Sequence, residues 1–164
     1  MATVAVVGTG TIGEPVARNL LGADFDVQVW NRTRERAEPL EQGGATVCDS
    51  AADAARGAEF VLTLLADADS TAETVEELEF EEGAVWVQIA TVGVDGAERL
   101  AELALEKGGA FVDAPVLGTR QPAEEGKLVV LASGPDDALD RCEPVFDAIG
   151  QKTRRLGYPR TAAS

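Results

Sequence analysis

Three glycines at residues 8–13, which read GTGTIG, have the spacing of loops that bind dinucleotide phosphates. The loop follows a β-branched apolar run at residues 3–7 and precedes apolar residues at helical spacing. In this context Gly8 makes a tight turn, Gly10 lets backbone amides approach a pyrophosphate, and Gly13 lets the helix pack closely on the strand. The helix amino terminus adds unpaired N–H groups and partial positive charge. The loop therefore predicts a dinucleotide site.

The end of the next expected strand, residues 26–30, decides between NAD and NADP. NAD sites usually place Asp or Glu there, because a carboxylate accepts hydrogen bonds from the ribose 2′-hydroxyl. This chain instead has Asn31, Arg32 and Thr33, whose amide, guanidinium and hydroxyl groups would hold a 2′-phosphate. Residues 31–36 also carry three arginines and one glutamate, in a chain of net charge −15. We therefore expect NADP(H) as the cofactor.

Strand-like and helix-like segments alternate along the chain and must position this loop. The expected strands are residues 3–7, 26–30, 46–48, 60–64, 84–89, 110–113 and 128–132. Among the expected helices are residues 33–42, an acidic helix within 66–82 and residues 136–149, whereas residues 114–127 are expected to form a loop. Such alternation predicts an α/β fold: a Rossmann-type, doubly wound, mainly parallel sheet in a single domain.

Composition excludes several classes of function. The 164 residues contain no histidine, which excludes histidine acid–base chemistry and most catalytic zinc sites, and no metal site is expected. Cys48 and Cys142 have no metal-ligand spacing, and we expect both to be reduced. The acidic balance disfavours binding to nucleic acid or anionic membranes, and no apolar run approaches the about 18 residues of a membrane span. The first residues lack a basic flank, so we expect a cytoplasmic protein.

Further motifs follow the glycine loop in a characteristic order. They are the Asn31-Arg32-Thr33 turn, the Leu64-Leu65-Ala66-Asp67 turn, the Ala90-Thr91-Val92 segment, the stretch DAPVLGT at 113–119 and the stretch PAEEGKL at 122–128. In this order the chain resembles the β-hydroxyacid dehydrogenase family from Val4 to about Gly157. The family includes 3-hydroxyisobutyrate dehydrogenase, glyoxylate and succinic semialdehyde reductases, and the nucleotide-binding half of 6-phosphogluconate dehydrogenase.

This resemblance implies NAD(P)-dependent interconversion of a 3-hydroxy acid and its semialdehyde, with a small-molecule carboxylate or aldehyde as the substrate. The implied cofactor residues are Gly8, Thr9, Gly10, Thr11, Ile12, Gly13, Asn31, Arg32, Thr33, Leu65, Ala66, Asp67 and Thr91. Of these, residues 31–33 would hold the 2′-phosphate, residues 65–67 would lie near the pyrophosphate and nicotinamide ribose, and Thr91 would lie at the nicotinamide end. The implied substrate residues are Leu117, Gly118, Thr119 and Arg120.

Two features depart from the family's pattern. Leu117 stands where the family usually has a serine that helps to hold the substrate carboxylate, although Arg120 could contact such a group. The family's general acid–base is a lysine in a separate helical domain, and none of Lys107, Lys127 and Lys152 fits that role. We therefore expect an NADP-binding domain at residues 1–157, a divergent tail at 158–164, no helical second domain, no catalytic residue and little or no catalysis by this chain alone.

Two alternative functions stay open. One is a stand-alone NADP-binding or regulatory module without catalysis. The other is the nucleotide domain of an imine reductase, which shares the Asn-Arg-Thr turn, although residues 113–127 favour the hydroxyacid dehydrogenases. A homodimer is the assembly that we consider.

Overall fold

The computed structural model describes residues 2–156, which form two sheets with helices packed around them. The larger sheet has six parallel strands in the order β3-β2-β1-β4-β5-β6. Its strands are β1 (Thr3–Val7), β2 (Asp26–Trp30), β3 (Thr46–Val47), β4 (Phe60–Thr63), β5 (Val85–Gln88) and β6 (Ala110–Asp113). The strand order reverses between β1 and β4, which is where open α/β sheets bind ligands. The predicted Rossmann-type fold is confirmed.

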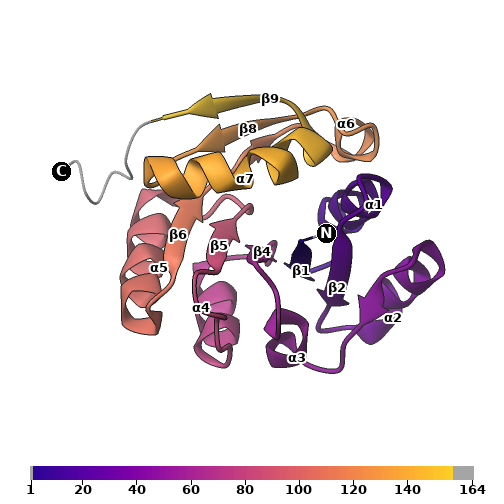
Figure 1. Cartoon of the computed structure of the whole chain (residues 1–164), viewed down its shortest axis with the longest axis horizontal. Helices are drawn as coiled ribbons and strands as arrows, with labels where there is room; N and C mark the ends of the chain where they lie inside the picture. Colours follow the sequence, from indigo (N-terminus) through magenta and orange to yellow (C-terminus); the bar gives the residue numbers. More distant parts are fainter. Residues whose placement is uncertain (1, 157–164) are drawn as a thin grey trace.

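Helices cover both faces of this sheet, because side chains along each buried strand alternate between two apolar clusters. One cluster includes Val4 and Val6 and lies against α1 (Gly13–Gly22), the short α2 (Arg34–Ala37) and η1 (Glu38–Gly43), and α7 (Asp136–Ile149). The other includes Ala5 and Val7 and lies against α3 (Ala51–Ala55), α4 (Ala68–Glu76) and α5 (Gly93–Lys107). Figure 1 shows α7 and α4 on opposite sides of the sheet.

The second sheet was not predicted. Residues 114–127, expected as a loop, contain β7 (Val116–Leu117) and α6 (Arg120–Glu124). The expected strand at 128–132 forms as β8 (Leu128–Ala132), but it pairs antiparallel with β7 and parallel with β9 (Gly150–Arg155) instead of extending the larger sheet. In Figure 1 β8 and β9 lie next to α7, on the side away from α4. Residues 114–127, called loop 114–127 below, therefore connect β6 of the larger sheet to β8 of the small sheet and contribute β7 to the latter.

Two predicted helices are shorter than expected. The helix expected at 33–42 divides into α2 and the 3₁₀ helix η1, because Pro39 has no N–H to donate to the preceding turn. The acidic helix ends at Glu76, so the remaining acidic residues up to Glu82 lie outside it. One of them, Glu81, accepts a hydrogen bond from the Gly57 N–H (2.7 Å).

Two other predictions concern the carboxyl-terminal tail and membrane-spanning helices. The predicted divergent tail at 158–164 lies outside the described residues. Within residues 2–156, no helix is long and apolar enough to cross a membrane.

Candidate functional site

The three loop glycines are required for different reasons. Gly8 has φ +110°, and a Cβ atom there would lie 2.4 Å from the Leu64 carbonyl oxygen. A Cβ atom at Gly13 would lie 1.9 Å from the Gly8 carbonyl oxygen. A Cβ atom at Gly10 would meet nothing within 4 Å. The fold therefore requires Gly8 and Gly13, whereas the open space beside Gly10 is what a bound group would need.

The side chain of Asn31 fastens this loop to the end of β2. Its Oδ1 accepts a hydrogen bond from the Thr9 N–H (2.8 Å), and its Nδ2 donates to the Thr33 carbonyl (3.0 Å). The Gly8 N–H donates to the Trp30 carbonyl (2.8 Å) alongside. The structure thus gives Asn31 a positioning role that the sequence did not reveal. The Thr9 hydroxyl is buried and has no hydrogen-bond partner among the described residues.

A cavity of about 310 Å³ opens at the glycine loop and follows the carboxyl ends of β4 and β5. Seven predicted cofactor residues line it: Gly10, Thr11, Ile12, Gly13, Leu65, Ala66 and Thr91. It is also lined by the predicted substrate residue Gly118 and by Leu64, Ile89, Ala90 and Val116, which were not predicted. The structure therefore brings the glycine loop, the turn after β4, the segment after β5 and loop 114–127 to one cavity.

Of the three arginines after β2, Arg34 forms ion pairs with described residues, whereas Arg32 and Arg36 do not. Arg34 pairs with Asp49 (2.6 Å) and Glu38 (3.5 Å). Arg32 is exposed and, among the described residues, makes no ion pair within 4.0 Å. The same holds for Arg36 in this part of the chain. The Arg32 guanidinium is therefore not held in an ion pair with a described residue, although its charge acts on Asp67.

Asp67 caps a helix and does not line the cavity. Its side chain accepts a hydrogen bond from the Ser70 N–H (2.8 Å) at the start of α4. This bond is the main reason that the pKa of Asp67 is lowered, and the positive charge of Arg32 contributes to the same shift. The side chains of Asp67 and Arg32 are therefore close enough to interact electrostatically.

The predicted substrate residues do not face one common site. Leu117 is exposed on β7, and Thr119 occupies the N-cap position of α6 without a side-chain hydrogen bond. Arg120 bonds to Glu14 in the first turn of α1 (3.0 Å), to Glu124 (3.0 Å) and to the Thr11 carbonyl (3.5 Å). Loop 114–127 is therefore attached to the glycine loop through Arg120.

The other partner of Glu14 is Arg18, whose guanidinium lies 2.9 Å from the carboxylate. Hydrogen bonds from Arg18 and then Arg120 lower the pKa of Glu14, which therefore stays ionised and paired at the amino terminus of α1. The two arginines offset a negative charge that would otherwise oppose an anion at this helix end.

A second cavity, of about 200 Å³, shares Thr91 with the first. It lies between the start of α5 and the small sheet, where Asp113, Ser133 and Leu156 contribute to its walls. None of the three lysines, Lys107, Lys127 and Lys152, lines either cavity. Across the described part of the chain, no cluster of three or more metal-ligating side chains is present.

Comparison with known proteins assigns the chain to a family. The family described as the NAD binding domain of 6-phosphogluconate dehydrogenase matches residues 3–157. The chain belongs to this family. It is therefore an NAD(P)-binding domain of the hydroxyacid dehydrogenase type, as the order of its motifs predicted.

Curated relatives include the uncharacterised oxidoreductase YfjR of Bacillus subtilis, 35% identical over 98% of this chain and 58% of the relative. Glyoxylate/succinic semialdehyde reductase 1 of Arabidopsis thaliana is 32% identical over 94% of this chain and 55% of its own length. The chain thus spans little more than half the length of these relatives.

Solved structures with the same fold include 3-hydroxyisobutyrate dehydrogenase of Mycobacterium tuberculosis, with a TM-score of 0.91 and 27% identity over 99% of this chain and 57% of that one. An imine reductase from a Pseudomonas species has a TM-score of 0.89 and 29% identity, over 98% of this chain and 57% of that chain. The backbone is therefore shared by members with different chemistry, so the fold alone does not distinguish them.

Proposed function

We propose that this chain binds NADP(H) and forms the nucleotide-binding domain of an oxidoreductase that interconverts a 3-hydroxy acid and its semialdehyde by hydride transfer. The observation that carries the proposal is the open space beside Gly10, within a loop whose other two glycines are required by packing. This space lies on the cavity wall, next to the amino terminus of α1. A pyrophosphate there would meet unpaired amides and the positive end of a helix dipole.

The preference for NADP(H) rests on Arg32. No carboxylate follows β2 at residues 31–33, and Arg32 is exposed without an ion pair among the described residues. A guanidinium can form paired hydrogen bonds with a phosphate. Asn31 supports this turn through its bonds to Thr9 and Thr33, which fix the backbone from which Arg32 projects.

The choice of hydroxyacid chemistry is supported by the stretches at 113–119 and 122–128 and by the reductase among the relatives. Leu117, exposed on β7, offers no hydroxyl, so we expect a substrate carboxylate to use the backbone near Gly118 in its place. An imine-reductase-like chemistry is the second candidate, because an imine reductase shares the fold at 29% identity.

When bound, the cofactor would supply or accept a hydride at its nicotinamide ring. The described residues would bind and orient it: the glycine loop holds the pyrophosphate, Arg32 holds the 2′-phosphate, and Ala90 and Thr91 form the wall toward the nicotinamide. None of the three lysines lines this cavity, so none is placed to protonate a carbonyl oxygen there. A positioned general acid contributes about 10²–10⁴-fold to such reactions.

Calorimetric titration with NADPH and NADH tests this proposal. We expect NADPH to bind at least tenfold more tightly, a difference of about 1.4 kcal/mol. Arg32→Ala should remove most of this preference, whereas the matched control Arg36→Ala should keep most of it. Equal affinities of the wild type for the two cofactors would refute the NADP(H) assignment, and binding of neither would refute the dinucleotide site.

A further inference from the structure

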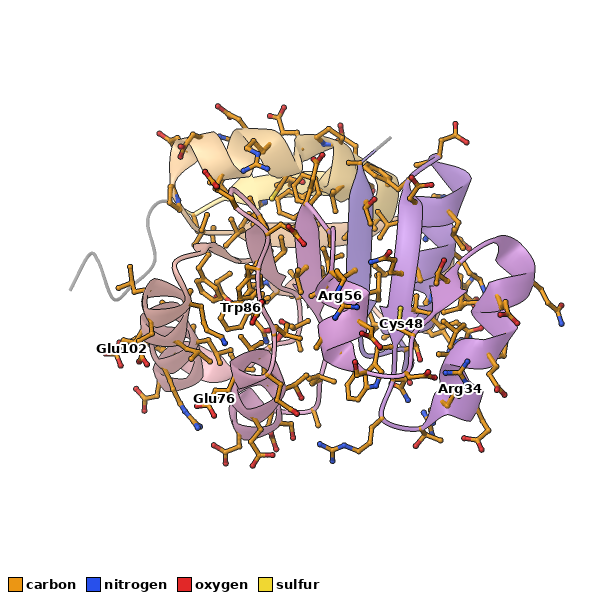
Figure 2. The ribbon with its side chains drawn as sticks, turned by 60° about the horizontal axis from the view of Figure 1, so that its bottom comes forward. Arg34, Cys48, Arg56, Glu76, Trp86 and Glu102 are labelled. Atoms are coloured by element: carbon orange, nitrogen blue, oxygen red, sulfur yellow. The ribbon has the colours of Figure 1, made fainter. Side chains whose placement is uncertain are left out.

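A buried hydrogen-bonded network lies at the carboxyl ends of β4 and β5, beneath the cavity wall. The indole N–H of Trp86 donates to the Thr63 hydroxyl oxygen (2.9 Å), and the Thr63 hydroxyl donates to Oε1 of Gln88. All three side chains are fully buried. Figure 2 shows Trp86 in the interior, near α5. Buried polar groups of this kind are retained only when their partners are in place.

Gln88 connects this network to the segments that line the cavity. Its Nε2 donates to the Ala90 carbonyl (2.9 Å), and its backbone carbonyl accepts the Ala114 N–H (2.8 Å). The Ile89 N–H donates to the Thr63 carbonyl (3.0 Å). A single residue thus joins β4, the segment after β5 and the start of loop 114–127.

The two ends of the cavity are held by hydrogen bonds from two different side chains. Asn31 fixes the glycine loop to β2 on one side of the sheet's switch point, whereas Gln88 fixes Ala90 on the other side. Ala90 and its neighbour Thr91 both line the cavity. The Ala90 N–H also lies 3.4 Å from the Thr63 carbonyl oxygen, and the Gln88 side chain is the group that holds the Ala90 carbonyl. Removal of the Gln88 bond should therefore alter this end of the cavity and leave the other end intact.

We propose that Gln88, oriented by Thr63, is a positioning residue that holds the Ala90–Thr91 wall and thereby sets the affinity for the nicotinamide half of the dinucleotide. This inference rests on the proposed function, which names the ligand. An apolar residue could fill the same buried volume as Gln88. The amide differs from such a residue in that it bonds to Thr63 and holds the Ala90 carbonyl.

The test compares Gln88→Met with the wild type in titrations with NADP⁺ and with 2′,5′-ADP, which carries only the adenosine half. We expect Gln88→Met to raise the Kd for NADP⁺ at least fivefold and to change the Kd for 2′,5′-ADP by less than twofold. Thr63→Val should behave in the same way, whereas Thr63→Ser keeps the hydroxyl and should match the wild type. Urea unfolding establishes that each variant is folded.

Equal weakening of both ligands by Gln88→Met would show a general structural role and overturn the proposal, as would unchanged NADP⁺ binding. Wild-type protein that binds neither ligand would refute the proposed function, and the inference with it.

A second measurement needs no variant in the network. The indole N–H resonance of Trp86, identified with Trp30→Phe, should shift when NADP⁺ is added and stay in place with 2′,5′-ADP. If the Trp86 resonance does not shift when NADP⁺ saturates the site, the proposed link between the buried network and the Ala90–Thr91 wall is contradicted.

Discussion

The glycine loop supports a prediction in which two similar substitutions have opposite effects. In Gly13→Ala the new Cβ atom would lie 1.9 Å from the Gly8 carbonyl oxygen, whereas ordinary contacts begin near 3.4 Å. The loop or α1 must therefore move by more than an ångström, because the Gly8 carbonyl is backbone and cannot rotate away as a side chain could. Overpacking of this kind typically costs about 1–3 kcal/mol, and the backbone clash places this variant at about 3 kcal/mol. Its melting temperature should fall by about 6–12 °C.

Gly10→Ala should have little effect on stability but a large effect on binding. Its Cβ atom meets nothing within 4 Å, and its φ angle is not in the left-handed region. Such a substitution changes the unfolding free energy by less than about 1 kcal/mol and can be stabilising. The added methyl group projects beside the cavity, so we expect NADPH to bind at least tenfold more weakly, or about 1.4 kcal/mol.

Thermal unfolding and calorimetric titration of both variants measure these two effects. If Gly10→Ala binds NADPH as tightly as the wild type, the open space beside Gly10 is not a phosphate site. If Gly13→Ala is as stable as the wild type, the packing argument for the third glycine fails.

Three further predictions concern other residues. Burial raises the pKa of Cys142 to about 12 and also raises the pKa of the less buried Cys48. A thiol reagent at pH 8 should therefore label Cys48 first and Cys142 only on unfolding. Equally fast labelling of both cysteines would contradict this prediction. Arg18 and Arg120 lower the pKa of Glu14, so the stability contributed by Glu14 is present above its ordinary pKa of 4.5 and is lost as the pH falls through the lowered value. The advantage of the wild type over Glu14→Gln in urea unfolding should therefore shrink between pH 6 and about pH 3, and a constant difference would refute the pairing. The 164-residue chain should show no steady NADPH oxidation with glyoxylate or succinic semialdehyde, and sustained turnover would reveal a proton donor that the described cavity does not contain.

The parts of the fold and site that the sequence predicted are those with local signals. The glycine loop has fixed spacing after a β-branched strand, and the buried strands β1, β4 and β5 of the larger sheet read as mainly apolar runs. β9 could not be predicted in this way, because GQKTRR shows neither an apolar run nor alternation, and its pairing with β8 stabilises it. β7 has only two residues and depends in the same way on β8.

The roles of individual side chains depended on contacts between distant parts of the chain. Asn31 was predicted only as a phosphate ligand, because nothing in the sequence shows that the Thr9 N–H would lie 2.8 Å from its side chain. Arg120 was expected at the substrate, yet it pairs with Glu14, more than a hundred residues earlier. Gln88 lies within an apolar run that predicts a buried strand, and its importance emerges only when β5 is placed beside Thr63 on β4.

A crystal structure of this chain with NADP⁺ tests the central claim most directly. The account predicts the pyrophosphate at the glycine loop beside Gly10, the 2′-phosphate within hydrogen-bond distance of Arg32, and the nicotinamide against Ala90 and Thr91. A dinucleotide bound elsewhere on the chain, or one whose pyrophosphate makes no contact with the glycine loop, would contradict it.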